Sequence, residues 1–287
     1  MAIHYPFFYC DFNRAKNYEA EYPGVSKIFD QPMAFWFGVK RGWHDVEVLT
    51  NRVQRLLHRA EPYLPIMVIY NLPDRDMGHY SKGGAKTCDQ YLEFIQNFAN
   101  ALEHHQPIII FEPDGLPHST LQSETERDLR IRLMRDGLTI LSEQTNALIY
   151  ADIGHSNWLS ASQAGELLNA INPAKSIRGF SVNVSNYRTT AESMRWGNEV
   201  LEHTDLTNYV VDTSRNGSGP YGNEWCNPPG RSLGCRPTTL TGDDRCDAFL
   251  WIKVPGESDG RCNGGPRAGR FWPEYAQELV QNTHWIR

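Results

Sequence analysis

Short apolar runs recur along the chain and alternate with longer segments in which apolar residues return every three or four positions. Most of the runs are apolar throughout, which is typical of parallel strands that are buried on both faces. They predict strands at residues 7–10, 34–37, 67–70, 108–111, 148–151, 179–182, 209–212 and 249–252.

The segments between these runs have the periodicity of amphipathic helices. They predict helices at residues 46–57, 89–102, 125–143, 161–171, 190–201 and 273–281. This alternation indicates an α/β fold built from βα units around a parallel sheet. No G-x-G-x-x-G motif follows an early strand, so a distorted, TIM-like (β/α) barrel is favoured over a doubly wound sheet. We expect one domain over residues 1–287, with a long irregular loop at 214–247 whose length is usual for functional loops.

Polar and acidic residues follow six of the predicted strands directly. The carboxyl ends of all barrel strands open at one face, where active sites are built. Turn chemistry explains one or two such clusters but not six, so we expect a polar site at this face. The residues are Asn71, Asp74, Arg75 and Asp76; Glu112 and Asp114; Asp152 and His155; Asn183 and Asn186; Asp212, Ser214, Arg215 and Asn216; and Lys253, Glu257 and Asp259.

The composition is that of an ordinary globular protein of 287 residues, with a formal net charge of −6 and no run of Lys or Arg. We therefore expect neither nucleic acid nor a membrane as a partner. No apolar run is long enough to span a bilayer, and residues 1–10 lack the basic and apolar regions of a signal peptide. Two readings remain: a cytoplasmic protein, or an exported one whose signal peptide was removed.

The cysteines favour export. Of the six cysteines, Cys226, Cys235, Cys246 and Cys262 fall in one loop-rich quarter of the chain, without the spacing of a zinc site. Disulfides in an oxidising compartment explain this grouping, and free thiols in a cytosolic protein are the alternative.

Clustered carboxylates suggest acid–base chemistry at the predicted site. Glycoside hydrolysis uses one carboxylic acid to protonate the leaving oxygen and usually a second carboxylate. The acid must keep its proton near the working pH, so burial or a nearby carboxylate must raise its pKa. Asp76 and Asp114 follow successive strands and are candidates. Metal binding competes for such residues, but neither an H-E-x-x-H nor an EF-hand spacing occurs, so we expect no metal and no cofactor.

Seven motifs run along the chain in a fixed order. They are VIYNLPDRD at 68–76, IIIFEPD at 108–114, DIGH at 152–155 with Trp158, NVSNY at 183–187, DTSRNG at 212–217, WCN at 225–227 and KVPGESDG at 253–260. In sequence and order they resemble glycoside hydrolase family six, the cellulases. One such motif is weak evidence, whereas the whole set spans nearly the entire chain and is specific.

The resemblance implies a distorted parallel barrel of about seven strands, and inversion at the anomeric carbon without a covalent intermediate. By motif position, Asp114 resembles the proton donor, and Asp76 resembles the acid that keeps the donor protonated and helps to position water. Tyr70 resembles a tyrosine that crowds the scissile sugar toward a distorted ring. Ser81 resembles a serine on a mobile loop that touches the attacking water. Asp259 resembles the residue proposed as base, for which a chain of waters is the alternative.

The same resemblance implies residues that bind sugars. Indole platforms for glucose rings correspond to Trp36, Trp158 and Trp225. Partners of the sugar hydroxyls correspond to Asp152, His155, Asn183, Asn186, Lys253 and Glu257. A core position is the alternative for each Trp and is preferred for Trp251, and His155 is alternatively a structural histidine. Arg75 and Arg215 are alternatively scaffold that holds a neighbouring carboxylate.

Two positions depart from the family pattern. Met77 stands where the family usually has a cysteine, so the disulfide normally anchored there must be absent, and the Ser81 loop lacks that constraint. Gly115 follows Asp114 where the family prefers a small or apolar side chain, which implies greater backbone freedom.

Three further expectations concern the cysteines. The pair Cys226 and Cys262 resembles the other bridge of the family. An additional local bridge is expected between Cys235 and Cys246. Cys10 and Cys88 either pair with each other or remain free.

Two loops bear on where a glucan chain is cut. Family members that work from chain ends enclose the cleft in a tunnel with two long loops, whereas residues 216–225 and 259–271 are short. We therefore expect an open cleft and a secreted, monomeric, inverting endo-1,4-β-glucanase acting on cellulose or related β-1,4-glucans. The alternatives are an exo-acting cellobiohydrolase, a non-catalytic glycan-binding relative, and a phosphosugar enzyme, for which Gly264 and Gly265 are a weak phosphate-loop candidate.

Overall fold

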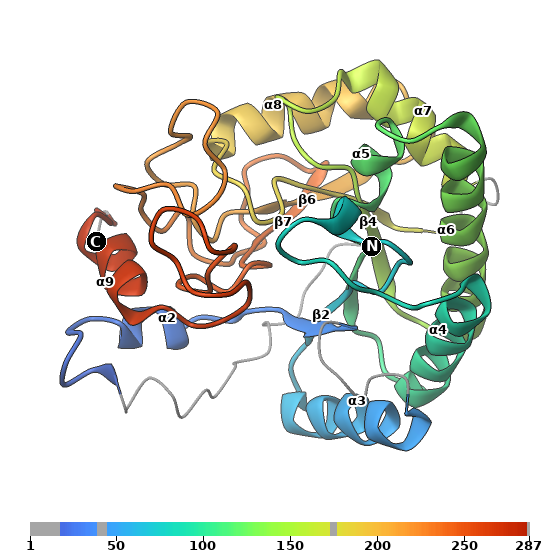
Figure 1. Cartoon of the computed structure of the whole chain (residues 1–287), viewed down its shortest axis with the longest axis horizontal. Helices are drawn as coiled ribbons and strands as arrows, with labels where there is room; N and C mark the ends of the chain where they lie inside the picture. The colour runs from blue at the N-terminus through green and yellow to red at the C-terminus, as the bar shows by residue number, and fades with distance from the viewer. Residues whose placement is uncertain (1–17, 39–44, 173–176, 286–287) are drawn as a thin grey trace.

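The computed structural model describes residues 18–38, 45–172 and 177–285. Within them, parallel strands form a seven-stranded sheet in which each strand lies beside its neighbours in sequence (Figure 1). The strands are β1 (Phe35–Phe37), β2 (Ile66–Ile69), β3 (Ile108–Phe111), β4 (Leu148–Asp152), β5 (Gly179–Val182), β6 (Asn208–Asp212) and β7 (Cys246–Leu250). The predicted distorted barrel is confirmed, and the strand predicted at 7–10 lies outside the described residues.

Helices cover the outer face of this sheet, and Figure 1 shows α3, α4, α6, α7 and α8 following one another around it. The helices are α2 (Ser26–Phe29), α3 (Val46–Ala60), α4 (Cys88–Leu102), α5 (Gly115–Ser119), α6 (Glu124–Gln144), α7 (Ala161–Ile171), α8 (Thr190–Leu201) and α9 (Pro273–Gln281), with a 3₁₀ turn, η1 (Asp76–Gly78). All six predicted helices are present. The short elements α2, α5 and η1 were not predicted, because so few residues carry no periodicity.

Both faces of the strands are buried, as the apolar runs predicted. Val68 and Ile110 pack with other inward-facing residues inside the barrel. Their neighbours Ile69 and Phe111 pack on the opposite face, beneath the helices. Residues that alternate along a strand point to opposite faces, so each apolar run supplies two cores.

The prediction for β7 was wrong by three residues, since the strand spans Cys246–Leu250 rather than 249–252. Trp251 and Ile252 are apolar and fully buried, but they leave the sheet. Their carbonyls accept hydrogen bonds from the other edge of the barrel, at 3.0 Å from Ala34 N and at 2.9 Å from Trp36 Nε1. The two edges therefore meet through these bonds, although β1 and β7 do not pair as strands in the described chain.

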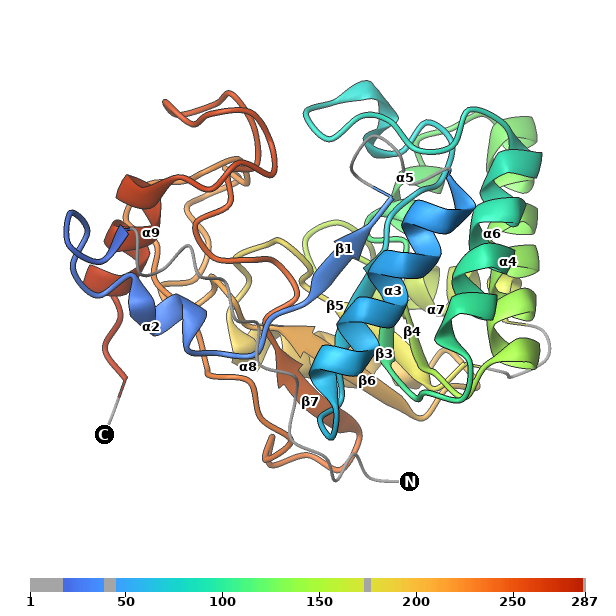
Figure 2. The same ribbon diagram turned by 90° about the horizontal axis from the view of Figure 1, so that it is seen from below.

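A third apolar cluster lies beside β7, where α2 and α9 pack together with Trp251. Figures 1 and 2 show these two helices side by side, apart from the outer helices α3, α4, α6, α7 and α8. Trp251 is thus a core residue, as preferred from its position in the sequence.

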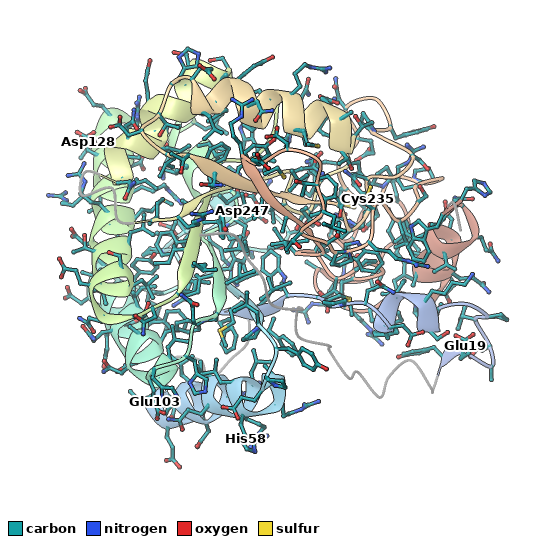
Figure 3. The ribbon with its side chains drawn as sticks, turned by 180° about the vertical axis from the view of Figure 1, so that it is seen from behind. Glu19, His58, Glu103, Asp128, Cys235 and Asp247 are labelled. Atoms are coloured by element: carbon teal, nitrogen blue, oxygen red, sulfur yellow. A yellow bond between two sulfur atoms is a disulfide. The ribbon has the colours of Figure 1, made fainter. Side chains whose placement is uncertain are left out.

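An ion pair lies among the amino ends of the strands. Arg178 donates from Nε and Nη2 to Asp247 at 2.9 and 2.8 Å, and Tyr150 Oη donates to the same carboxylate at 2.6 Å. Asp247 is labelled in Figure 3, which views the molecule from behind. Separately, none of the helices described is both long enough and apolar enough to cross a bilayer.

Candidate active site

A cleft of about 1230 Å³ opens at the carboxyl ends of the strands. Its walls come from β1, from α3 and from the segments that follow β2, β3, β4, β5, β6 and β7, which is the face the sequence predicted. The predicted site residues that line it are Trp36, Tyr70, Asp76, Ser81, Asp114, His155, Trp158, Asn186, Trp225, Lys253, Glu257 and Asp259.

Asp114 is half-buried at the start of α5, directly after β3. Its backbone has a φ of 64°, a left-handed conformation that costs a non-glycine residue energy. The buried carboxylate of Asp152 holds this geometry, because Asp114 N donates to Asp152 Oδ1 at 2.9 Å. Burial, and then the negative charges of Asp152 and Asp76, raise the pKa of Asp114 well above its ordinary range. Asp114 is therefore a carboxyl that keeps its proton.

Gly115 supports this turn through its small size. A Cβ at this position would lie 2.8 Å from Leu72 Cδ1, and φ is not positive there. A side chain at this position would have to displace the Leu72 methyl group, so glycine fits closely here, and the greater backbone freedom of Gly115 stays a prediction.

Asp76 and Ser81 are joined by a hydrogen bond across a tight loop. Ser81 N donates to Asp76 Oδ2 at 2.6 Å, and Arg75 Nε donates to Ser81 O at 2.8 Å. Arg75 Nη1 also donates to Tyr70 O at 2.6 Å and to Gly38 O at 2.7 Å. Burial raises the pKa of Asp76. Arg75 thus positions the loop through three backbone carbonyl oxygens, rather than through the ion pair with a carboxylate that the scaffold alternative supposed.

Asp259 is surrounded by cations, whereas Asp114 is surrounded by carboxylates. Its Oδ2 lies 2.9 Å from Arg215 Nη1 and its Oδ1 lies 3.4 Å from Lys253 Nζ. Asn227 N also donates to Oδ2, at 3.1 Å. Burial alone would raise the pKa of Asp259, but the charges of Arg215 and Lys253 outweigh it and lower the pKa below its ordinary value. Asp259 is therefore an ionised carboxylate held between Arg215 and Lys253.

Buried carboxylates also tie together the loops that carry the site. Glu112, fully buried after β3, accepts from Asn71 N and Leu72 N at 3.0 and 3.1 Å. Asp212, at the end of β6, accepts from Ser185 N and Lys253 N at 3.0 Å each. Each acid holds the loop after a neighbouring strand. The sequence placed both among the polar strand ends but gave no role to them.

Two of the residues predicted to bind sugar hydroxyls lie beneath the cleft rather than in its lining. Asp152 and Asn183 are fully buried and do not line the cleft. Asp152 is occupied by backbone N–H groups and by Ser181 Oγ at 3.1 Å. Asn183 donates to Asp212 O at 2.8 Å and accepts from Arg188 N at 2.9 Å. Both support the walls from beneath, because their side chains point into the protein rather than into the cleft.

Aromatic rings are distributed along the cleft. Trp36 meets Tyr70 edge to face, with ring centroids 5.4 Å apart. Trp158 lies 5.7 Å from His155 and 5.0 Å from His118, a cleft residue that the sequence did not single out. Burial lowers the pKa of both histidines to about 4, so both are neutral at pH 7.

The sequence profile of glycosyl hydrolases family 6 matches residues 12–283. This chain belongs to that family. The family's endoglucanase A from Cellulomonas fimi is 37% identical over 264 residues, which are 91% of this chain and 56% of that enzyme. Endoglucanase A from Thermobispora bispora is 40% identical over 224 residues, or 77% of this chain and 48% of that protein. The chain thus spans about half the length of these two relatives.

A solved structure of family 6 has the same fold. The endoglucanase Cel6 from Mycobacterium tuberculosis, in complex with methyl-cellobiosyl-4-deoxy-4-thio-β-D-cellobioside, superposes with a TM-score of 0.91. It is 36% identical, and the match covers 98% of each chain.

The disulfide between Cys226 and Cys262 that the family-6 resemblance implied is present. The expected bridge between Cys235 and Cys246 is wrong, because both thiols are free. Cys246 is buried at the start of β7, whereas Cys235 is exposed, with Sγ 4.0 Å from Thr190 Oγ1. Cys88 is also free, which agrees with the alternative that Cys10 and Cys88 do not pair, and Cys10 itself lies outside the described residues.

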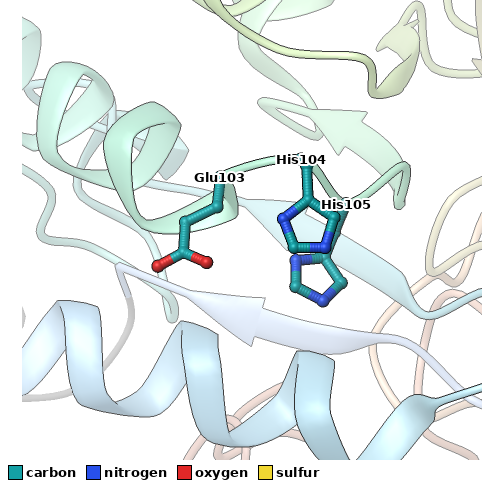
Figure 4. Close-up of side chains that lie close together, drawn as sticks. All are labelled: Glu103, His104 and His105. Carbon is teal, nitrogen blue, oxygen red and sulfur yellow. The ribbon is translucent and has the colours of Figure 1, made fainter.

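In the described chain, one group of possible metal ligands lies outside the family-6 cleft: Glu103, His104 and His105 (Figure 4). The group follows α4 and precedes β3, at the amino end of the sheet. His105 already has partners on both ring nitrogens, with Nδ1 3.1 Å from Leu102 O and Nε2 3.2 Å from Glu61 Oε1. We assign no metal role to it.

Proposed function

We propose that this chain is an inverting endo-1,4-β-glucanase that cleaves internal bonds of cellulose or related β-1,4-glucans. The observation that supports this most is Asp114, a carboxyl with a raised pKa in a cleft that indole side chains also line. Such an acid can protonate a leaving glycosidic oxygen near neutral pH. The Mycobacterium tuberculosis relative bound to a thio-linked cello-oligosaccharide derivative supports a β-glucan ligand.

In the proposed reaction Asp114 donates its proton to the glycosidic oxygen while water attacks the anomeric carbon from the opposite face. Asp76 keeps Asp114 protonated through its negative charge, and Ser81, held by Asp76, contacts the water. Tyr70, buried beneath Trp36, crowds the scissile sugar. Asp259 is the proposed base, but its lowered pKa makes it a weak proton acceptor, which favours relay through water.

We propose that the three indoles of the cleft form the sugar subsites. Trp36, Trp158 and Trp225 line the cleft at separate loops and offer flat apolar faces to glucose rings. Among the polar residues lining the cleft, His155, Asn186, Lys253 and Glu257 are the proposed partners of sugar hydroxyls. Asp152 and Asn183 act from beneath, as positioning residues.

We further propose that the enzyme is an exported monomer in which residues 1–287 form one catalytic domain. The bridge between Cys226 and Cys262 supports an oxidising compartment. A net charge of −6 disfavours binding to nucleic acid or to anionic membranes.

The alternative is an exo-acting cellobiohydrolase, since fungal cellobiohydrolases match this chain at 29–31% identity. The bacterial endoglucanases match at 37–40%, which favours internal cleavage. The test is to follow viscosity and reducing ends together on carboxymethyl cellulose. A steep viscosity loss with few new ends supports the proposal. Slow viscosity loss with accumulating cellobiose would identify the exo enzyme, and binding without release would identify a non-catalytic relative.

A further inference from the structure

One aromatic side chain, that of Tyr80, joins two walls of the cleft. Tyr80 follows η1 on the β2 side of the sheet and lines the cleft. Its ring packs on the backbone of Gly260, on the β7 side, where a Cβ atom would lie 2.3 Å from Tyr80 Cγ. Figures 1 and 2 both show the two loops approaching one another. Tyr80 therefore joins the wall that carries Asp76 to the wall that carries Asp259.

The indole of Trp225 extends this contact. The ring centroids of Tyr80 and Trp225 are 6.0 Å apart, and the rings are tilted by 55°. A sugar stacked between two rings needs van der Waals contact on both of its faces, or roughly 7–8 Å between the rings. At 6.0 Å the rings contact each other, so they close this part of the cleft instead of sandwiching a sugar.

The loop that carries Tyr80 is anchored at its base. The hydrogen bonds from Ser81 N to Asp76 and from Arg75 to Ser81 O fix the residues next to Tyr80 on the β2 side. The contacts of the Tyr80 ring with the far wall are packing contacts, which are individually weak. The ring remains 48% exposed. It can therefore leave the far wall while the base of the loop stays in place.

We propose that Tyr80 is a specificity-determining residue that controls how a glucan chain enters the cleft. An internal bond of a polymer can reach Asp114 only if the chain enters from the side, because its ends are far away. Tyr80 blocks that direction while its ring rests on Gly260 and Trp225. A short oligosaccharide can pass beneath the ring end-on. The inference rests on the proposed glucanase function and refines it: the ring sets the ratio of internal to end-directed cleavage.

The test uses two variants that remove the closure in different ways. Tyr80→Ala deletes the ring, and Gly260→Ala displaces it, because the added Cβ would overlap Tyr80 Cγ. Both are expected to raise the viscosity loss of carboxymethyl cellulose per reducing end, by about two- to ten-fold, the effect of one lost aromatic contact. Tyr80→Phe keeps the ring, so its viscosity loss per reducing end should equal that of the parent.

Tyr63→Ala is the matched control. Tyr63 is 46% exposed, close to the value for Tyr80, but it precedes β2 and does not line the cleft. Its substitution should leave the ratio unchanged. Gly260 is buried, so thermal unfolding of Gly260→Ala is recorded as well, and Tyr80→Ala carries the test if that variant is unstable.

The outcomes separate this inference from the function on which it rests. An unchanged or lowered ratio in Tyr80→Ala, from a parent that degrades the polymer, would overturn the role of Tyr80 and leave the glucanase function standing. A parent that releases no reducing ends would instead reject the proposed function itself.

Discussion

Asp114 and Asp259 face the same cleft from the ends of β3 and β7, yet their surroundings favour opposite charge states. Around Asp114 the strongest neighbouring charges are the carboxylates Asp152 and Asp76, and its pKa is raised. Around Asp259 the strongest are two cations, and its pKa is lowered. Burial opposes ionisation at both sites, so the sign of the neighbouring charge decides. Two identical side chains therefore receive different chemical tasks from their partners.

Removing Asp114 should have the largest effect. Asp114→Asn keeps the shape but cannot donate a proton, so release of reducing ends from β-1,4-glucan should fall by about 10²–10⁴-fold. Binding of cello-oligosaccharides, measured by titration calorimetry, should persist. Asp128→Asn changes an exposed acid on α6, labelled in Figure 3, and serves as the control. A near-parent rate in Asp114→Asn would remove this residue from the acid role.

Removing the ion pair between Arg215 and Asp259 should lower the stability of the protein. Arg215→Met leaves Asp259 buried with a weaker counter-charge, and we expect the free energy of unfolding in urea at pH 7 to fall by about 3–5 kcal/mol. The pKa of Asp259 is lowered in the fold, so its stabilising contribution is present above its unfolded pKa and lost as the pH falls. The loss in Arg215→Met should therefore shrink in acid.

Arg178→Met provides the matched control for that variant. It breaks a similar Arg–Asp pair with Asp247 at the other end of the sheet. We expect it to lower stability without moving the pH dependence of hydrolysis. If Arg215→Met were as stable as the parent, the ion pair with Asp259 would not hold that side of the cleft.

Asp76→Asn should move the pH profile. Removing the negative charge of Asp76 lowers the pKa of Asp114, which must be protonated to act. The alkaline limb of the kcat profile should therefore shift to lower pH. Asp74→Asn, two residues away and exposed, should leave that limb in place. An unmoved limb in Asp76→Asn would contradict the coupling of the two acids.

Glu112→Gln should have the smallest effect, on stability. Burial raises the pKa of Glu112 from 4.5 to about 7. A raised pKa means that the contribution of this group is full below pH 4.5 and is lost as the pH rises through 7. Glutamine does not titrate, so unfolding in urea should depend less on pH across this range than it does in the parent. Parallel pH curves for the two proteins would show that Glu112 does not titrate in this way.

The elements of the fold were largely predictable, because burial on both faces leaves apolar runs that can be read directly. β7 was the exception: Trp251 and Ile252 are as apolar as strand residues, but they bond to the β1 edge. Apolar character reports burial, whereas strand pairing depends on which edge is within reach. The predicted bridge between Cys235 and Cys246 was wrong for a similar reason: sequence spacing does not show in which direction each thiol points.

The position of the site followed from the strand ends, but the direction of each side chain did not. Asp114 follows β3 and Asp152 is the last residue of β4, yet Asp114 lines the cleft and Asp152 lies fully buried beneath it. Tyr80 was not singled out, because its partners Gly260 and Trp225 are distant in sequence.

The sequence by itself determined the family, the order of strands and helices, and the face of the barrel that carries the acids. These follow from local patterns and from motifs that are contiguous in the chain. Only the tertiary structure decided which acid keeps its proton, which one is ionised, and where Tyr80 crosses the cleft. A pKa and a side-chain contact depend on groups brought together from distant segments, and folding alone fixes those distances.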